Sequence, residues 1–165
     1  MIHHAVTRSA TQRVTLDIDS SESSVHGAQE QSAYNRHFES VCYHPHFVFN
    51  QGGDCLAATL RPGNVHSADG WDTVLLPVID RCQLGGRTVV VRADAAFAIP
   101  ALNEALEQRG VAYPTRLPAN DVLERATRIC SPGRPAAGPP GRPSHAPVVR
   151  YRSFQYQATS WNRGE

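Results

Sequence analysis

The chain has 165 residues, enough for one domain that buries about 68–70% of its unfolded surface. Its 16 basic residues, all arginine, nearly balance 15 acidic residues, and the formal charge of +1 argues against a strongly basic nucleic-acid-binding protein or one that seeks acidic partners. The four cysteines are widely spaced and form no CxxC pair, which predicts reduced thiols and a cytoplasmic protein. No apolar run reaches the roughly 18–20 residues of a membrane span, so we expect no membrane partner.

Residues 1–12 form a lead-in, and the first predicted element is a strand over residues 13–20. Its side chains alternate between an apolar face and a polar face that carries Asp17 and Asp19. Two carboxylates on one strand face lie roughly 7 Å apart, and a purely structural strand avoids such repulsion. The pattern indicates a divalent-cation site about as strongly as a strand that simply ends in a turn after Asp19.

Two further strands should follow a polar loop. They are expected over residues 40–50 and 55–60, and the Gly-Gly pair between them favours a β-hairpin. A cluster of possible zinc ligands lies on these strands, namely Cys42, His44, His46 and Cys55. Zinc ligands usually follow C-x2–4-C or H-x3–5-H spacing, so packing in the core is the favoured interpretation of this cluster.

The middle of the chain predicts a helix followed by a buried strand. Apolar residues at helical spacing follow a Ser67 cap, and Pro77 should interrupt this helix because proline lacks an amide proton. The strand, 87–94, contains a continuous apolar run, as in a strand buried on both faces, and ends in Asp94. An aspartate after a strand often caps the next helix, but that helix begins only at Pro100, so Asp94 is not its cap.

Three elements complete the predicted order. A helix closes at Gly110, an edge strand containing Pro114 covers residues 111–117, and a last helix begins after an Asn120 cap. The order is β-β-β-α-β-α-β-α, an α/β fold with a five-stranded mixed sheet. Its crossover helix makes the strand of residues 87–94 a parallel neighbour of the first strand.

This topology brings two strand ends together. Parallel neighbours point their carboxyl ends the same way, so Asp19 and Asp94 should emerge side by side. Carboxylates are the ligands of hard cations such as Mg²⁺. Two such ions about 3.5–4 Å apart can activate water and stabilise the leaving oxygen in phosphodiester cleavage. The sequence therefore predicts a metal site built on Asp19 and Asp94.

Five blocks of sequence resemble the DDE transposases of bacterial insertion sequences. They occur in the family's order and are Leu16–Glu22, Tyr43–Pro45 with Phe47–Asn50, Leu60–Ser67, Arg92–Phe97 and Arg116–Asn120. The resemblance implies a ribonuclease H-like fold that cuts and joins double-stranded DNA at transposon ends and target. It also implies a site that holds two Mg²⁺ or Mn²⁺ ions when complete.

The resemblance assigns roles to individual residues. Asp19, followed by a small hydroxyl residue, matches the family's first aspartate, and Asp94 matches its second, which implies catalytic and metal-binding roles for both. Asp17 is the alternative to Asp19 as the first metal ligand. Arg92 and His66 lie near these strand ends. They are expected to contact DNA, to position the metal ligands, or to be surface side chains in loops.

The chain departs from the family at the third acidic residue. The family's glutamate helix carries the pattern Tyr-x2-Arg-x3-Glu-x6-Lys, but this chain has no lysine, and its only Tyr-x2-Arg, at Tyr113, has Asn120 in the place of the glutamate. Glu165, the last residue, has no helical pattern around it. We therefore expect a partial ribonuclease H-like core over residues 13–130, truncated as an inserted β module begins and inactive in strand transfer.

The tail, residues 131–165, differs in composition from the core. Its first part, residues 131–147, contains six of the twelve prolines, which predicts a linker. Arg150 and Arg152 then alternate with aromatic residues, a combination typical of nucleic-acid contact. The same stretch also fits the first strands of the incomplete β module.

Three functional hypotheses remain open. The first is a transposase fragment that pairs with itself as a homodimer or with an intact transposase. The second is a stand-alone Mg²⁺-dependent nuclease, which needs a third carboxylate from Glu22, Glu39 or Asp54. The third is a DNA-binding remnant without catalysis that inhibits intact transposase.

Overall fold

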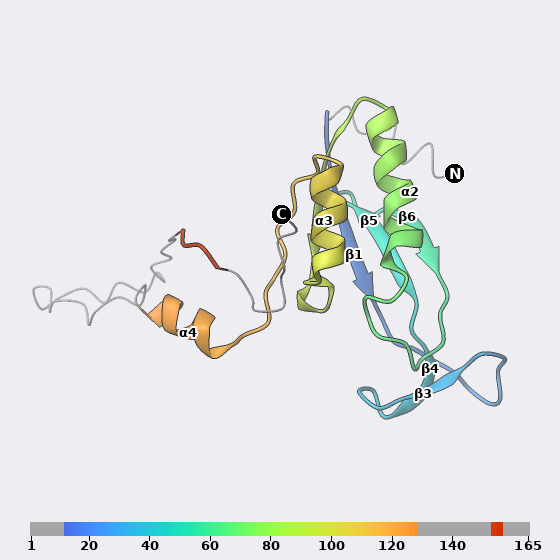
Figure 1. Cartoon of the computed structure of the whole chain (residues 1–165). Helices are drawn as coiled ribbons and strands as arrows, with labels where there is room; N and C mark the ends of the chain where they lie inside the picture. The colour runs from blue at the N-terminus through green and yellow to red at the C-terminus, as the bar shows by residue number, and fades with distance from the viewer. Residues whose placement is uncertain (1–11, 129–152, 157–165) are drawn as a thin grey trace, which may run out of the picture. The chain divides into compact units, whose positions relative to one another are not determined.

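The computed structural model describes residues 12–128 and 153–156. The chain forms two compact units, residues 1–118 and 119–165, and each is described by itself. Figure 1 shows the elements. Their order is β1 (Arg13–Ser20), β2 (Ser23–Ser24), β3 (Ala33–Asn35), β4 (Ser40–Tyr43), β5 (His46–Asn50), β6 (Cys55–Thr59), α2 (Trp71–Leu84), β7 (Thr88–Ala93), a 3-10 turn η1 (Ala95–Phe97), α3 (Pro100–Gln108) and α4 (Asp121–Arg128).

The main sheet has β1 near its centre. Its strand order is β6-β5-β1-β7, with β1 antiparallel to β5 and parallel to β7. The expected parallel pairing of the first strand with the strand after the crossover helix is therefore confirmed. The expected hairpin between β5 and β6 also forms, with a register shift between Val48 and Phe49. The α/β class with a mixed sheet is confirmed at this level.

The expected fifth strand, over residues 111–117, is present only as two isolated bridges to β7. Within residues 12–128, the segment beside β7 forms only isolated parallel bridges, from Val90 to Ala112 and from Ala93 to Thr115. Pro114 lies between them and has no amide proton to donate to a ladder. The segment lies at the edge as expected, but the full five-stranded pattern does not form in the described residues.

A second, small sheet replaces part of what the sequence predicts as a long strand and a loop. The stretch 40–50 is divided into β4 and β5, and the break falls at His44 and Pro45. Pro45 cannot donate to a continuing ladder, which explains the break. The small sheet has the order β2-β4-β3, so two residues of the expected loop, Ser23 and Ser24, pair with β4.

The helices differ from expectation mainly at their ends. Helix α2 begins at Trp71 after Gly70, whose φ of 71° is left-handed, and Ser67 is not its cap. It continues unbroken through Pro77. In α4, Asn120 Oδ1 accepts the amide of Leu123 at 2.9 Å, which confirms the predicted cap.

One face of the main sheet packs on α2 and α3. The buried cluster combines the inward residues of β1 and β7 with the apolar stripes of the two helices; it includes Val14, Leu16, Ile18, Val89, Val91, Leu75, Ile79, Leu102 and Leu106. Val122 of α4 is 60% exposed. Among the described residues, no helix is both long and apolar enough to cross a bilayer.

Candidate active site

The β1–β7 register determines where the two key aspartates lie. Asp17 is paired with Arg92 and Ile18 with Ala93, so Asp19 and Asp94 are the next residue of each strand. Neighbouring strands are separated by about 4.8 Å, which makes the two positions adjacent at the same end of the sheet. Both residues are exposed. The expected meeting of these strand ends is thus present in the backbone.

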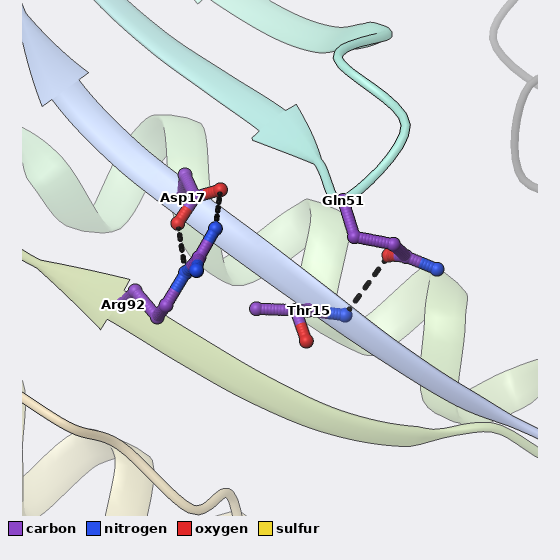
Figure 2. Close-up of polar contacts among 4 residues, drawn as sticks. All are labelled: Thr15, Asp17, Gln51 and Arg92. Atoms are coloured by element: carbon purple, nitrogen blue, oxygen red, sulfur yellow. Dashed lines mark hydrogen bonds and ion pairs between the residues drawn. The ribbon is translucent and has the colours of Figure 1, made fainter.

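Asp17 is held by an arginine on the neighbouring strand. Arg92 Nε and an Arg92 terminal nitrogen donate to the two carboxylate oxygens of Asp17, each at 2.6 Å (Figure 2). The hydrogen bonds and charge of Asp17 raise the pKa of Arg92. In the same view, the green helix α2 runs behind the strands. Leu16 and Ile18 of β1 pack in one buried cluster with residues of α2 and α3, so the Asp17–Arg92 pair lies on the opposite face of the sheet. Both oxygens of Asp17 are therefore engaged, unlike those of Asp19.

Asp19 and Asp94 each use one oxygen to bind nearby backbone. Asp19 Oδ1 accepts the Ser20 amide at 2.8 Å, and Asp94 Oδ1 accepts the Ala96 amide at 3.0 Å. Asp94 does not cap α3, as expected, but it does cap the 3-10 turn η1, which the sequence did not reveal. These local hydrogen bonds hold each carboxylate through its Oδ1. The second oxygen, Oδ2, takes no part in them.

Aromatic rings flank the aspartates on the side away from Arg92. In the β1–β5 register, Asp17 is opposite Phe49 and Asp19 is opposite Phe47, so these side chains share one face of the sheet. The two phenyl rings stack with their centroids 5.8 Å apart. The carboxylates thus lie between a guanidinium and an apolar wall.

No third acidic residue joins this pair in the described part of the chain, where no group of three potential ligands could hold a metal ion. Glu22 instead accepts hydrogen bonds from Ser24 and Ser40 in the small sheet. Asp54 accepts one from Asn50 in the hairpin turn. Cys42, His44, His46 and Cys55 likewise form no such group of three in the described residues.

Arg61 organises the loop before α2, a role that was not predicted from the sequence. Its guanidinium is buried and donates to the carbonyls of His44 at 2.8 Å, His66 at 3.1 Å and Asp69 at 2.6 Å. Burial lowers the pKa of Arg61, and the charge of Asp69 partly opposes this. An arginine before Pro-Gly is typical of a turn, so no sequence pattern predicts this buried role.

His46 connects this loop to the turn that carries Asp94. It is fully buried, its Nε2 bonds the Ser67 carbonyl, and its ring lies 5.6 Å from the ring of Phe97 in η1. In the β1–β5 register it is opposite Ser20, beside Asp19. Burial lowers the pKa of His46 despite the raising effect of its bond to Ser67.

The four residues predicted to contact DNA do not form one cluster among the described residues. Arg92 is the partner of Asp17, with its side chain 57% exposed. His66 is exposed in the loop before α2, where its Nδ1 accepts the Ala68 amide at 3.1 Å. Arg150 and Arg152 lie outside the described residues.

The chain also matches a known protein family. The family described as transposase DDE domain, group 1, matches residues 1–165. No curated protein is a significant match to the chain.

Proposed function

Since this chain belongs to the transposase DDE domain family, group 1, we propose that Asp19 and Asp94 supply two carboxylate ligands of a divalent-metal site for DNA transposition. Family membership implies transposition as the process and DNA as the partner. The residue roles, the Mg²⁺ or Mn²⁺ ions and the level of activity belong to the proposal.

The β1–β7 register is the observation that carries this proposal. It makes Asp19 and Asp94 neighbours at the ends of two parallel strands, and both are exposed. Carboxylate oxygens match the preference of Mg²⁺ for hard ligands, so the donor set fits such an ion. When bound, the metal would polarise phosphodiester oxygens and lower the pKa of water.

Asp17 has a different role in this proposal. Its two oxygens are both engaged by Arg92, and this ion pair reduces the repulsion between the two carboxylates of β1. We therefore place Asp19, rather than Asp17, in the metal site. Arg92 influences the metal site indirectly, by holding Asp17. Its side chain is also exposed enough to bind a DNA phosphate.

Two carboxylates are fewer than a two-ion site needs. Within residues 12–128 and 153–156 no third acidic group joins them. The 165 residues also lack the complete glutamate-helix pattern of the family, because they contain no lysine. We propose that these residues alone bind one ion weakly and do not carry out strand transfer.

Mn²⁺ titration, followed by electron paramagnetic resonance of the free ion, tests the two ligands. Asp19→Asn and Asp94→Asn should each reduce the affinity for Mn²⁺ at least about tenfold, since each removes one charged ligand. Asp17→Asn should retain most of the affinity for Mn²⁺. Asp72→Asn, which changes an exposed aspartate in the first turn of α2, is the matched control. Equal affinity in Asp19→Asn, Asp94→Asn and the control would overturn the assignment.

A further inference from the structure

A hollow outside the carboxylate pair lies between two loops of the first unit. Its volume is about 490 Å³, and it lies between the turn after β3 and the loop before α2. The side chains at its walls include Tyr34, Arg36, His37, Phe38, His44 and His66. None of its lining residues is acidic.

Buried polar side chains hold both walls of this hollow. Asn35 donates to the Gly63 carbonyl at 2.6 Å, and its oxygen accepts the amides of His37 at 2.8 Å and Phe38 at 3.2 Å. Arg61 binds the carbonyls of the opposite loop. Since burying such groups costs free energy unless they are fully bonded, the two walls are fixed before any ligand arrives.

The position of the hollow relates it to the proposed metal site. Strand β5 begins at His46, which is opposite Ser20 at the carboxyl end of β1. His44 lies two residues before that strand and its Nδ1 bonds the Val65 carbonyl at 3.3 Å. The hollow is thus at the end of the sheet where Asp19 emerges.

The chemistry of the walls indicates the ligand. Phe38 lies edge-on to His37 and His44, with ring centroids 4.9 and 5.6 Å away, which makes an aromatic wall. Arg36 and His66 are exposed at the rim and can bind a phosphate. A planar base on an aromatic wall with a phosphate at a cationic rim is the combination by which single-stranded nucleic acid is bound.

We propose that this hollow binds an unpaired nucleotide of DNA, with the base beside Phe38 and the phosphate at Arg36. The proposal rests on the function proposed above, because it takes DNA as the partner. The imidazoles do not compete as a zinc site, since the described residues contain no group of three metal ligands.

The test measures binding of the full chain to a single-stranded 12-mer that carries one 2-aminopurine, by fluorescence change and anisotropy. Phe38→Ala should weaken binding about fivefold or more and remove the change in 2-aminopurine fluorescence, because stacking on one ring contributes that much. Phe38→Tyr should restore both. Arg36→Gln should weaken binding, whereas Arg13→Gln, which changes an exposed arginine at the other end of β1, should not.

Each other outcome has a defined meaning. Tighter binding of the matching duplex, with no fluorescence change, would overturn the proposal in favour of backbone contact alone. Loss of binding in Phe154→Leu but not in Phe38→Ala would overturn it in favour of the C-terminal segment. If inorganic phosphate competes with the oligonucleotide as strongly as a mononucleotide does, the hollow recognises only the phosphate. That result would overturn the role of the base. Asp19→Asn should leave this binding intact, so failure of the metal-site proposal is distinguishable.

Discussion

Gly63 lies where the loop before α2 passes against the backbone of the small sheet. A Cβ atom at this position would lie 2.4 Å from the Ala33 carbonyl oxygen and 2.5 Å from that of Cys42. Both are backbone atoms of paired strands, so they cannot move without opening the sheet. We expect Gly63→Ala to lower the free energy of unfolding by about 2–3 kcal/mol, the upper range for overpacking, as measured by urea denaturation.

Gly52→Ala is the matched control for this substitution. The closest neighbour of its added methyl group would be the side-chain oxygen of Asn50, at 3.2 Å, and a side chain can shift. The control should therefore lose clearly less stability than Gly63→Ala. Similar losses in the two variants would show that the close approach at Gly63 contributes little.

Some residue roles were visible in the sequence and others were not. The alternation in β1 and the apolar run in β7 place Asp19 and Asp94 at strand ends without any knowledge of contacts. The Asp17–Arg92 pair joins residues 75 positions apart, so it depends on the β1–β7 register, which periodicity alone does not provide. The buried role of Arg61 is likewise set by carbonyls of a loop that has no regular pattern.

At the scale of elements, strong patterns were reliable and short ones were not. Strands β1, β5, β6 and β7 carry enough branched and aromatic residues for periodicity to reveal them. The two-residue strand β2 consists of serines and forms only because β4 offers a free edge. The division of the stretch 40–50 at Pro45 also follows from proline chemistry, but only the neighbouring sheet shows that both halves remain strands.

His46, the first residue of β5, should make the stability of the fold decrease at acidic pH. The Nε2 of His46 bonds the Ser67 carbonyl and its Nδ1 has no partner among the described residues, so protonation would bury an unsatisfied N–H. Burial lowers the pKa of His46, and of His44, below 6.5. Between that lowered pKa and 6.5 the unfolded chain binds more protons than the folded chain. Stability is therefore complete above pH 6.5 and decreases below it, by at most about 1.4 kcal/mol per pH unit for each histidine.

Urea denaturation at pH 7.5 and pH 5.5 measures this effect. His46→Gln retains an N–H for the Ser67 carbonyl but does not titrate, so we expect it to lose less stability between the two pH values than the wild-type chain. His26→Gln, which changes an exposed histidine, should lose as much as the wild-type chain. An unchanged pH dependence in His46→Gln would contradict the role of this histidine.

At the scale of the first unit, the sheet has two unlike faces. One packs on α2 and α3 through the buried cluster, and the other carries Asp17, Asp19 and Arg92 with the stacked rings of Phe47 and Phe49. Burial of the first face stabilises the fold, and the second face carries the carboxylates of the proposed metal site. The separation follows directly from the alternation of β1, because successive side chains point to opposite faces.

The whole chain should not cleave DNA in a way that depends on Asp94. Two carboxylates can bind one ion, but stabilising both the attacking and the leaving oxygen takes two ions and at least one further ligand. With supercoiled plasmid and Mg²⁺, we expect the 165-residue chain and its Asp94→Ala variant to give the same low level of nicked circles on agarose gels. Nicking by the unchanged chain that is lost in Asp94→Ala would instead support a stand-alone nuclease. DNA binding that weakens steeply with salt and is unaffected by Asp19→Ala would, with the absence of nicking, favour a DNA-binding role over catalysis.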